Sequence, residues 1–285
     1  MPQLGRDLKP KNTYYFDHVL IIGNGFDLDV GLPTSYSDFL ASSNFQLLLE
    51  SNNRLTRHLS STQERNNWVD IEQELVRYSN LSHGRKNPIE FRNDYLALCD
   101  ALENYIRQID YANLDKSSRA AALLARLAKT NKLCVVNFNY TRTAEYLLQA
   151  EPSAVSHIQV HGSAKNKDTV FGVHDSAGIQ PNHVFLRKAV SKGFFVDCLV
   201  GEIMKNAKES VSIFGHSLGE TDHTQFLPFF GPGQNKKLSN IDIYYNSENG
   251  YYNLYQQLDK LTSQRLQTLR TKHNFRMLGP TGNGQ

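Results

Sequence analysis

The sequence predicts an α/β protein: a parallel sheet with helices on both faces and a large all-helical insertion after the first strand. Two patterns support this fold class. Short apolar runs typical of strands alternate with helical segments, which is the element order that produces parallel sheets. In addition, the long segment 41–130 has helical periodicity and separates the first strand-like run from the second.

The strand-like runs are short and rich in β-branched and aromatic residues. They are residues 19–22, 133–136, 157–160, 169–172, 211–214 and 241–245. We expect helices over residues 141–150 and 194–208, between successive strands. Strands and helices in alternation favour right-handed crossovers, so the sheet should be covered on both faces.

The insertion is predicted from helix-start signals and apolar periodicity. Asn87, Pro88 and Glu90 have the spacing of a cap, a first-turn proline and a capping-box partner. Two stripes with helical spacing are expected to be core, namely Phe91, Tyr95, Leu98, Leu102, Tyr105 and Ile109, and Trp68, Ile71 and Leu75.

These elements predict three regions. Residues 14–40 and 131–250 form the Rossmann-like core, residues 41–130 form the helical insertion, and residues 251–285 form a C-terminal helix and flexible tail. Within the last region, Arg265 to Arg276 is a basic, helix-like run.

Composition limits the class of protein. The 285 residues are 40% hydrophobic, enough for a core, and the net charge of +3 is too slight to indicate a nucleic-acid partner by itself. Cys99, Cys134 and Cys198 lack C-x-x-C spacing, which argues against disulfides and zinc. No apolar run approaches the roughly 18 residues that span a bilayer, and residues 1–12 lack a signal-peptide core. We therefore expect a cytoplasmic protein with no membrane partner and no metal.

The first strand-like run ends in the glycine turn Gly23-Asn-Gly25. Because glycine has no Cβ, the backbone there can approach a pyrophosphate closely. A helix, whose start is marked by Thr34, Ser35 and Asp38, would add its positive end. The third glycine of the dinucleotide fingerprint is replaced by Leu28, which disfavours an ordinary nicotinamide dehydrogenase. A tight turn without a ligand remains an alternative.

Polar side chains follow the predicted strands. They are Asn24 and Asp27, Asn137 and Asn139, His161 and Ser163, His216 and Ser217, and Asn246, Ser247 and Glu248. Each one by itself fits a satisfied loop residue. Because the carboxyl ends of parallel strands meet at one edge of a sheet, five such ends together predict a binding or catalytic site there.

The order of these motifs carries a resemblance to two protein groups. The series Gly23-Asn-Gly25, Asn137-Phe-Asn-Tyr140, Val160-His-Gly-Ser163, Gly215-His-Ser-Leu218 and Tyr245-Asn-Ser-Glu248 resembles the sirtuins and their NAD-handling superfamily. Over residues 18–250 the chain more closely resembles the AbiH family of phage abortive-infection proteins. The motifs are Ile21-Ile-Gly-Asn-Gly-Phe-Asp27, Gly31-Leu-Pro-Thr-Ser-Tyr-Ser-Asp-Phe39, Trp68-Val-Asp-Ile-Glu72, Phe171-Gly172 and Phe214-Gly-His-Ser-Leu-Gly-Glu-Thr-Asp222.

The sirtuin resemblance implies a sirtuin-like sheet and a role for each matching residue. Gly23 and Gly25 would cradle the pyrophosphate of NAD. Asn139 would hold a water or hydroxyl near the nicotinamide ribose, and His161 would act as general base or bind that ribose. Three scattered cysteines do not match the four-cysteine zinc module of sirtuins, so protein deacylation is disfavoured.

Further nucleotide contacts are implied at other positions. Ser217 would contact phosphate or ribose, and Asn246 the adenosine ribose. Asn24, Phe26 and Asp27 stand where sirtuins have smaller residues and would suit a different nucleotide. The resemblances together imply a phage-defence protein that binds, and hydrolyses at the N-glycosidic bond, NAD or a related nucleotide. A phage component would be its trigger, and a homo-oligomer is compatible with the sequence.

Two alternatives stay open. Gly215-His-Ser-Leu-Gly219 matches the nucleophile elbow of serine hydrolases, and Asp242 and His273 follow in the required order. Few residues remain after Ser217 to complete that fold, which opposes this alternative.

The other alternative is a non-catalytic nucleotide sensor or a nucleic-acid-binding module. It would use the basic residues Arg54, Arg57, Lys86, Arg92, Lys260, Arg265, Arg270, Lys272 and Arg276. Asp70, Glu72 and Glu74 fit a solvated helix face, although Glu72, one turn after Trp68, could reach the pocket.

Overall fold

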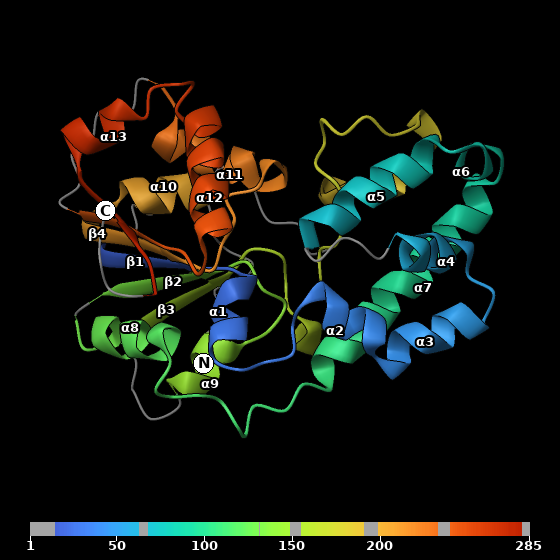
Figure 1. The fold of residues 1–285 in the computed structure, drawn as a ribbon, viewed down its shortest axis with the longest axis horizontal. Helices are drawn as coiled ribbons and strands as arrows, with labels where there is room; N and C mark the ends of the chain where they lie inside the picture. The colour runs from blue at the N-terminus through green and yellow to red at the C-terminus, as the bar shows by residue number, and fades with distance from the viewer. Residues whose placement is uncertain are drawn as a thin grey trace.

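A six-stranded parallel sheet with the order β3-β2-β1-β4-β5-β6 forms the centre of the computed structural model (Figure 1). The model describes residues 15–62, 68–130, 132–148, 155–190, 199–232 and 240–280. The strands are β1 (Phe16–Ile22), β2 (Leu133–Asn137), β3 (Val155–Gln159), β4 (Ala207–Phe214), β5 (Asn240–Tyr244) and β6 (Asn274–Leu278). This is the strand order of a doubly wound Rossmann sheet, so the predicted fold class is confirmed.

Helices cover both faces of the sheet. In β1, Leu20 and Ile22 belong to one core and Val19 and Ile21 to the other, because alternate side chains of a strand point to opposite faces. The first face carries α1 (Asn24–Asp29), α8 (Arg119–Ala128) and α9 (Thr143–Leu147). The second carries α10 (Leu199–Lys205), α11 (His223–Phe230), α12 (Glu248–Leu261) and α13 (Gln267–Lys272).

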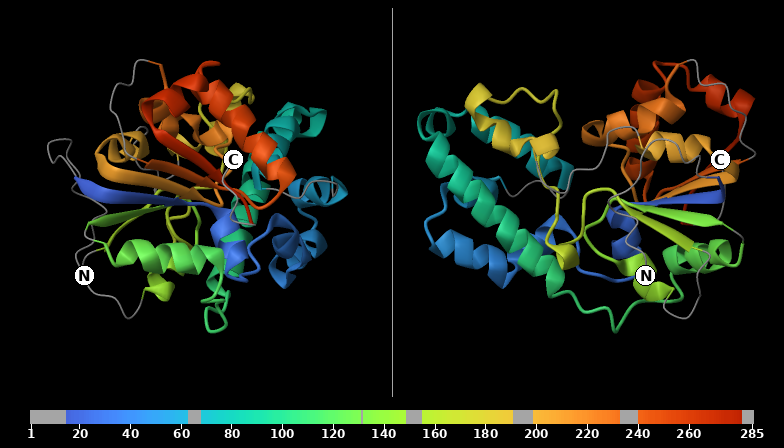
Figure 2. Two further views of the ribbon diagram at one scale, coloured as in Figure 1. Left: turned by 60° about the vertical axis from the view of Figure 1, so that its left-hand side comes forward. Right: turned by 180° about the vertical axis from the view of Figure 1, so that it is seen from behind.

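The remaining α-helices form a separate group beside the sheet, which we call the helical unit (Figure 2). They are α2 (Tyr36–Ala41), α3 (Ser43–Glu50), α4 (Arg54–Ser61), α5 (Trp68–Asn80), α6 (Ser82–Lys86) and α7 (Pro88–Arg107). None of the described helices is both long enough and apolar enough to cross a membrane.

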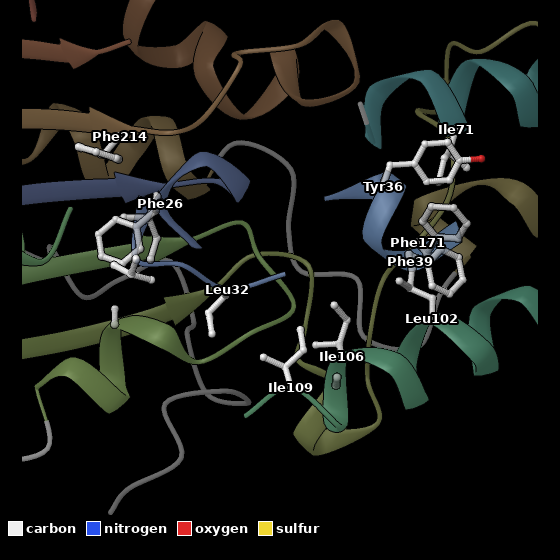
Figure 3. Packing of buried hydrophobic residues seen from close by; sticks show 14 of the residues in the cluster. Phe26, Leu32, Tyr36, Phe39, Ile71, Leu102, Ile106, Ile109, Phe171 and Phe214 are labelled. Carbon is white, nitrogen blue, oxygen red and sulfur yellow. The ribbon is translucent and has the colours of Figure 1, made fainter. Parts of the chain in front are cut away.

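A second stretch of chain completes the helical unit. After β3 the backbone forms the 3₁₀ turns η1 (Ala164–Asn166), η2 (Pro181–Leu186) and η3 (Lys188–Val190). His183 Nδ1 in η2 lies 2.8 Å from the Ser79 hydroxyl in α5. One buried apolar cluster continues from Phe26 beside the sheet through Leu32 to Phe39 and Leu102 (Figure 3).

Two helix starts test the capping predictions. α2 begins with a capping box, in which the Asp38 amide donates to Ser35 Oγ at 3.1 Å and the Ser35 amide donates to Asp38 Oδ2 at 2.9 Å. α7 begins at Pro88 as predicted. The prediction of a capping box there is wrong, because the Asn87 side chain makes no capping hydrogen bond. The carboxylate of Glu90 instead lies 3.2 Å from Arg54 Nε.

The predicted strand over residues 169–172 is also wrong. The chain leaves the sheet there, and the Val170 amide donates to the His161 carbonyl at 2.8 Å. Phe171 packs on Tyr95 of α7, with ring centroids 6.2 Å apart, so this apolar run is buried by the helical unit rather than by strands. The helix predicted over residues 194–208 is shorter in the structure: α10 occupies residues 199–205, and residues 207–208 belong to β4. Residues 194–198 lie outside the described residues. So do residues 149–150, the end of the helix predicted over 141–150.

The predicted helix-like run from Arg265 to Arg276 needs a correction as well. After α13 the chain enters β6, which pairs with β5 and extends the sheet. The region following residue 250 therefore contains a strand in addition to helices. Arg276 donates to both oxygens of Asp242 on β5 at 2.7 Å, and this cross-strand ion pair explains why the basic residue lies in a strand.

Candidate functional site

The strand order reverses between β1 and β4, and the carboxyl ends of parallel strands at such a switch point are where α/β proteins bind ligands. The loops after β3 and β4 place a histidine and a carboxylate together at this edge. His161 follows β3, and Asp222 lies in the turn η4 (Glu220–Asp222) after β4. Nε2 of His161 is 3.1 Å from Oδ1 of Asp222.

The charge of Asp222 determines the tautomer of His161. Burial by itself would raise the pKa of Asp222, but Lys188 and His161 outweigh it and hold this pKa well below its ordinary range. An ionised carboxylate only accepts hydrogen bonds, so Nε2 of His161 carries a proton, and in the neutral imidazole the lone pair is on Nδ1. Nδ1 is buried and has no hydrogen-bond partner among the described residues.

Lys188, at the start of η3, connects this pair to the helical unit. Its Nζ lies 2.8 Å from Glu72 Oε1 on α5 and 3.4 Å from Asp222 Oδ1. Burial alone would lower the pKa of Lys188, but the carboxylates of Asp222 and Glu72 raise it above its ordinary value. The ammonium is therefore charged, although only 7% of the side chain is exposed.

A second histidine approaches Asp222 from the loop after β4. Nδ1 of His216 accepts a hydrogen bond from the Leu218 amide at 2.9 Å, so its Nε2 carries the proton. This Nε2 lies 3.6 Å from Asp222 Oδ2. The ring of Phe138 lies close to both histidines, with centroid distances of 5.4 Å to His161 and 4.2 Å to His216, and restricts both imidazoles.

A pocket of about 20 Å³ lies beside these groups, room for about one water molecule. It is lined by His161, His174, Asp175, Lys188, Ala189, Thr221, Asp222, Thr224 and Gln225. The lining thus joins the loops after β3 and β4 to the segment that completes the helical unit.

Of the residues predicted for the site, the structure places only His161 in this lining. The glycines of the first loop have another role, since a Cβ on Gly23 or Gly25 would lie 2.7 Å from backbone atoms of Gly215. The Gly25 amide also donates to the Gly215 carbonyl at 2.9 Å. Close approach of the loops after β1 and β4 therefore accounts for both glycines, and pyrophosphate binding there stays a prediction.

The helix after this loop starts earlier than predicted. α1 begins at Asn24, directly after the strand, whereas Ser35 caps α2. Phe26 is fully buried in the core of the first face. Asn24, the first residue of α1, is half-buried, and nucleotide binding by Asn24 and Phe26 stays a prediction.

Asp27 and Asn139 connect the ends of β1 and β2. Asp27 is fully buried and accepts a hydrogen bond from the Thr141 hydroxyl at 2.6 Å, and burial raises its pKa to about 6. The Asn139 side-chain amide donates to the Gly23 carbonyl at 3.0 Å. Neither side chain lines the pocket, and Ser217 and Asn246 are exposed and outside it.

Two members of the cluster, Asp222 and Lys188, were not predicted as site residues from the sequence. Asp222 ends the motif Phe214-Gly-His-Ser-Leu-Gly-Glu-Thr-Asp222, which was the available signal for it. Lys188 has no local signal, because its role depends on carboxylates distant in sequence. Glu72, noted as able to reach the pocket, does reach Lys188.

The geometry opposes the serine-hydrolase alternative. Ser217 follows β4 at the carboxyl edge, whereas His273 immediately precedes β6 at the opposite edge of these parallel strands. A five-residue strand spans roughly 17 Å, too far for a hydrogen-bonded triad. Asp242 lies inside β5 and is paired with Arg276.

The basic residues near the C-terminus are largely engaged within the protein. Lys260 pairs with Glu220, and Arg270 donates to the Tyr255 hydroxyl at 2.9 Å. With Arg276 paired to Asp242, these contacts give no specific support to a nucleic-acid interface.

Fold and cluster together define an α/β protein of Rossmann type with a buried His–Asp–Lys–Glu site shared between its sheet and a helical unit. The family model for bacteriophage abortive infection AbiH matches residues 19–122 and 89–240 of this chain. The chain belongs to the AbiH family and is accordingly a phage-defence protein of the abortive-infection type. No curated protein matches the chain in sequence.

Proposed function

We propose that this protein acts in abortive infection by hydrolysing NAD or a related nucleotide at its N-glycosidic bond, after a phage component has triggered it. One observation carries the proposal. His161 is fixed through Nε2 by an ionised Asp222, its Nδ1 has no hydrogen-bond partner among the described residues, and the residue lines a pocket on the carboxyl edge of the sheet. A histidine held in this way is suited to proton transfer at neutral pH.

The chemistry requires one base. The bond between ribose C1′ and the nicotinamide nitrogen breaks, and its electron pair neutralises the cationic ring. Water adds to C1′ while Nδ1 of His161 takes a proton from that water. Asp222 stabilises the resulting imidazolium through Nε2–H, and His216 and Lys188 keep the carboxylate in place. The products are nicotinamide, ADP-ribose and a proton.

A metabolite comparison tests the class of reaction. Cells producing the wild-type chain or Asp222→Asn would be compared with and without phage. We expect nicotinamide and ADP-ribose to accumulate only in infected wild-type cells, because an amide at position 222 removes the charge that fixes the base. Glu220→Gln, in the same turn but paired with surface Lys260, is the matched control and should behave as wild type.

One result would contradict hydrolysis, and another would contradict the role of the His161–Asp222 pair. Protection from phage with no change in NAD or other nucleotides would favour the sensor alternative. Undiminished nucleotide loss with Asp222→Asn would remove the His161–Asp222 pair from the mechanism.

A further inference from the structure

Lys188 is bound by more negative charge than it can neutralise. One ammonium contacts the carboxylates of Glu72 and Asp222, and the side chains of both acids are largely buried, with exposures of 12% and 15%. One lysine charge facing two buried carboxylates leaves an excess of negative charge among these three side chains. Such an excess in a buried site is costly unless another group compensates it.

The two carboxylates are not held equally. Asp222 is also bonded to His161 and approached by His216, so it remains anchored if Lys188 moves. Within the described residues, Glu72 has Lys188 as its one ion-pair partner, and its second oxygen, Oε2, is buried without a hydrogen bond. Glu72 is therefore the carboxylate that can be exchanged.

The pocket beside these groups is small for a nucleotide. A space of about 20 Å³ is far below the roughly 300–1,000 Å³ of small-molecule sites. Glu72 belongs to the helical unit and Asp222 to the loops of the sheet, and Lys188 joins them. We expect a ligand larger than water to reach His161 when this connection changes.

We propose that Lys188 is the anion-binding residue of the site, and that it exchanges the Glu72 carboxylate for a phosphate group of the ligand. Without ligand, Glu72 occupies the position of that anion and keeps the site closed. A lysine separated from Glu72 keeps Asp222 as its anionic partner and has N–H donors free for a further acceptor, which phosphate oxygens provide. The inference rests on the proposed function in one respect, that the ligand is a phosphate-bearing nucleotide.

Calorimetric binding of ADP-ribose and inorganic pyrophosphate tests the exchange without any hydrolysis. Glu72→Gln removes the competing charge at nearly constant volume, so both ligands should bind about tenfold more tightly, within the usual range of coupling between sites. Lys188→Met should lose binding, whereas Lys188→Arg, which keeps the cation, should retain it. The double variant Glu72→Gln/Lys188→Met should match Lys188→Met, because Glu72 acts through Lys188.

Controls separate this effect from general electrostatics and from folding. Glu74 lies on the same helix as Glu72, but its carboxylate pairs with His58 and Arg77. The Glu74→Gln protein should therefore bind ADP-ribose as the wild type does. Nicotinamide riboside, which has no phosphate, should show no gain with Glu72→Gln. Unfolding curves establish that each variant is folded.

Unchanged or weaker ADP-ribose binding by folded Glu72→Gln would overturn the proposal, as would binding retained by Lys188→Met. Tighter binding in a protein that never hydrolyses NAD would instead reject the proposed reaction and leave Lys188 as the anion-binding residue of a sensor.

Discussion

Nε2 of His161 and Oδ1 of Asp222 lie 3.1 Å apart, although the two residues are 61 positions apart in sequence. They follow β3 and β4, which are separated in the sheet by β2 and β1. The loops therefore extend over two strand ends to meet, and the pair forms only when the whole carboxyl edge is assembled.

Substitution of His161 and of Asn139 should have different effects on stability. His161→Ala should lower NAD hydrolysis by about 10²–10⁴-fold, the usual contribution of a general base, with little loss of thermal stability. Asn139→Ala removes the side-chain donor to the Gly23 carbonyl, which keeps the Phe26 amide as a donor at 2.8 Å, and should cost about 1 kcal/mol of unfolding free energy. Nicotinamide release and urea unfolding measure the two quantities.

The same variants test whether Asn139 also acts in catalysis. If both side chains serve one transition state, the double variant should hydrolyse NAD little more slowly than His161→Ala. His273→Ala, outside the site, is the control. A folded His161→Ala protein with full activity would exclude this histidine as the base.

Asp27 should make the protein less stable as the pH rises from about 4 to 6. Its pKa is about 6 in the folded protein, against 3.8 for an unperturbed aspartate, so the folded state binds more protons in this interval. Two pKa units correspond to roughly 3 kcal/mol, and Asp27→Asn should remove this slope. Urea unfolding at several pH values measures it, and a parallel pH dependence of both proteins would contradict the assignment.

Gly25→Ala should destabilise the fold by roughly 1–3 kcal/mol, as overpacking does, because the added Cβ would lie 2.7 Å from Gly215 Cα. Gly178→Ala is the matched control, since a Cβ there meets nothing within 4 Å. Thermal unfolding compares the two. Equal stability with selective loss of ADP-ribose binding would restore the phosphate-cradle role of Gly25.

Ser217→Ala should keep at least part of the hydrolytic activity, because the side chain is exposed and does not line the pocket. A lost hydrogen bond to a ligand would cost on the order of 1 kcal/mol, whereas a lost nucleophile would abolish turnover. We expect no labelling of Ser217 by a fluorophosphonate probe. Labelling at this position would revive the serine-hydrolase alternative.

The sheet could be predicted from sequence where its strands are buried on both faces. Val19 to Ile22 is uniformly apolar because both cores contact β1, and this pattern is local. β6 was missed because it lies at the edge of the sheet, where Arg276 is stabilised by Asp242 from another strand. That partner is not visible in the local pattern of residues 265–276.

The site was predictable only in part for a similar reason. His161 follows a strand directly, so its place at the carboxyl edge follows from the fold. Lys188 lies in a connection that passes through the helical unit, and its position depends on packing between η2 and α5. Contacts of this kind require tertiary structure, which periodicity does not encode.

The central place of β1 also affects the chain while it is being translated. β1 gains its first neighbour only after residue 137 has emerged from the ribosome and its second after residue 214. Asp222 follows the second of these strands. Because domains assemble progressively during synthesis, a polypeptide interrupted earlier lacks the carboxylate that fixes His161. Products truncated before residue 222 therefore contain no His161–Asp222 pair.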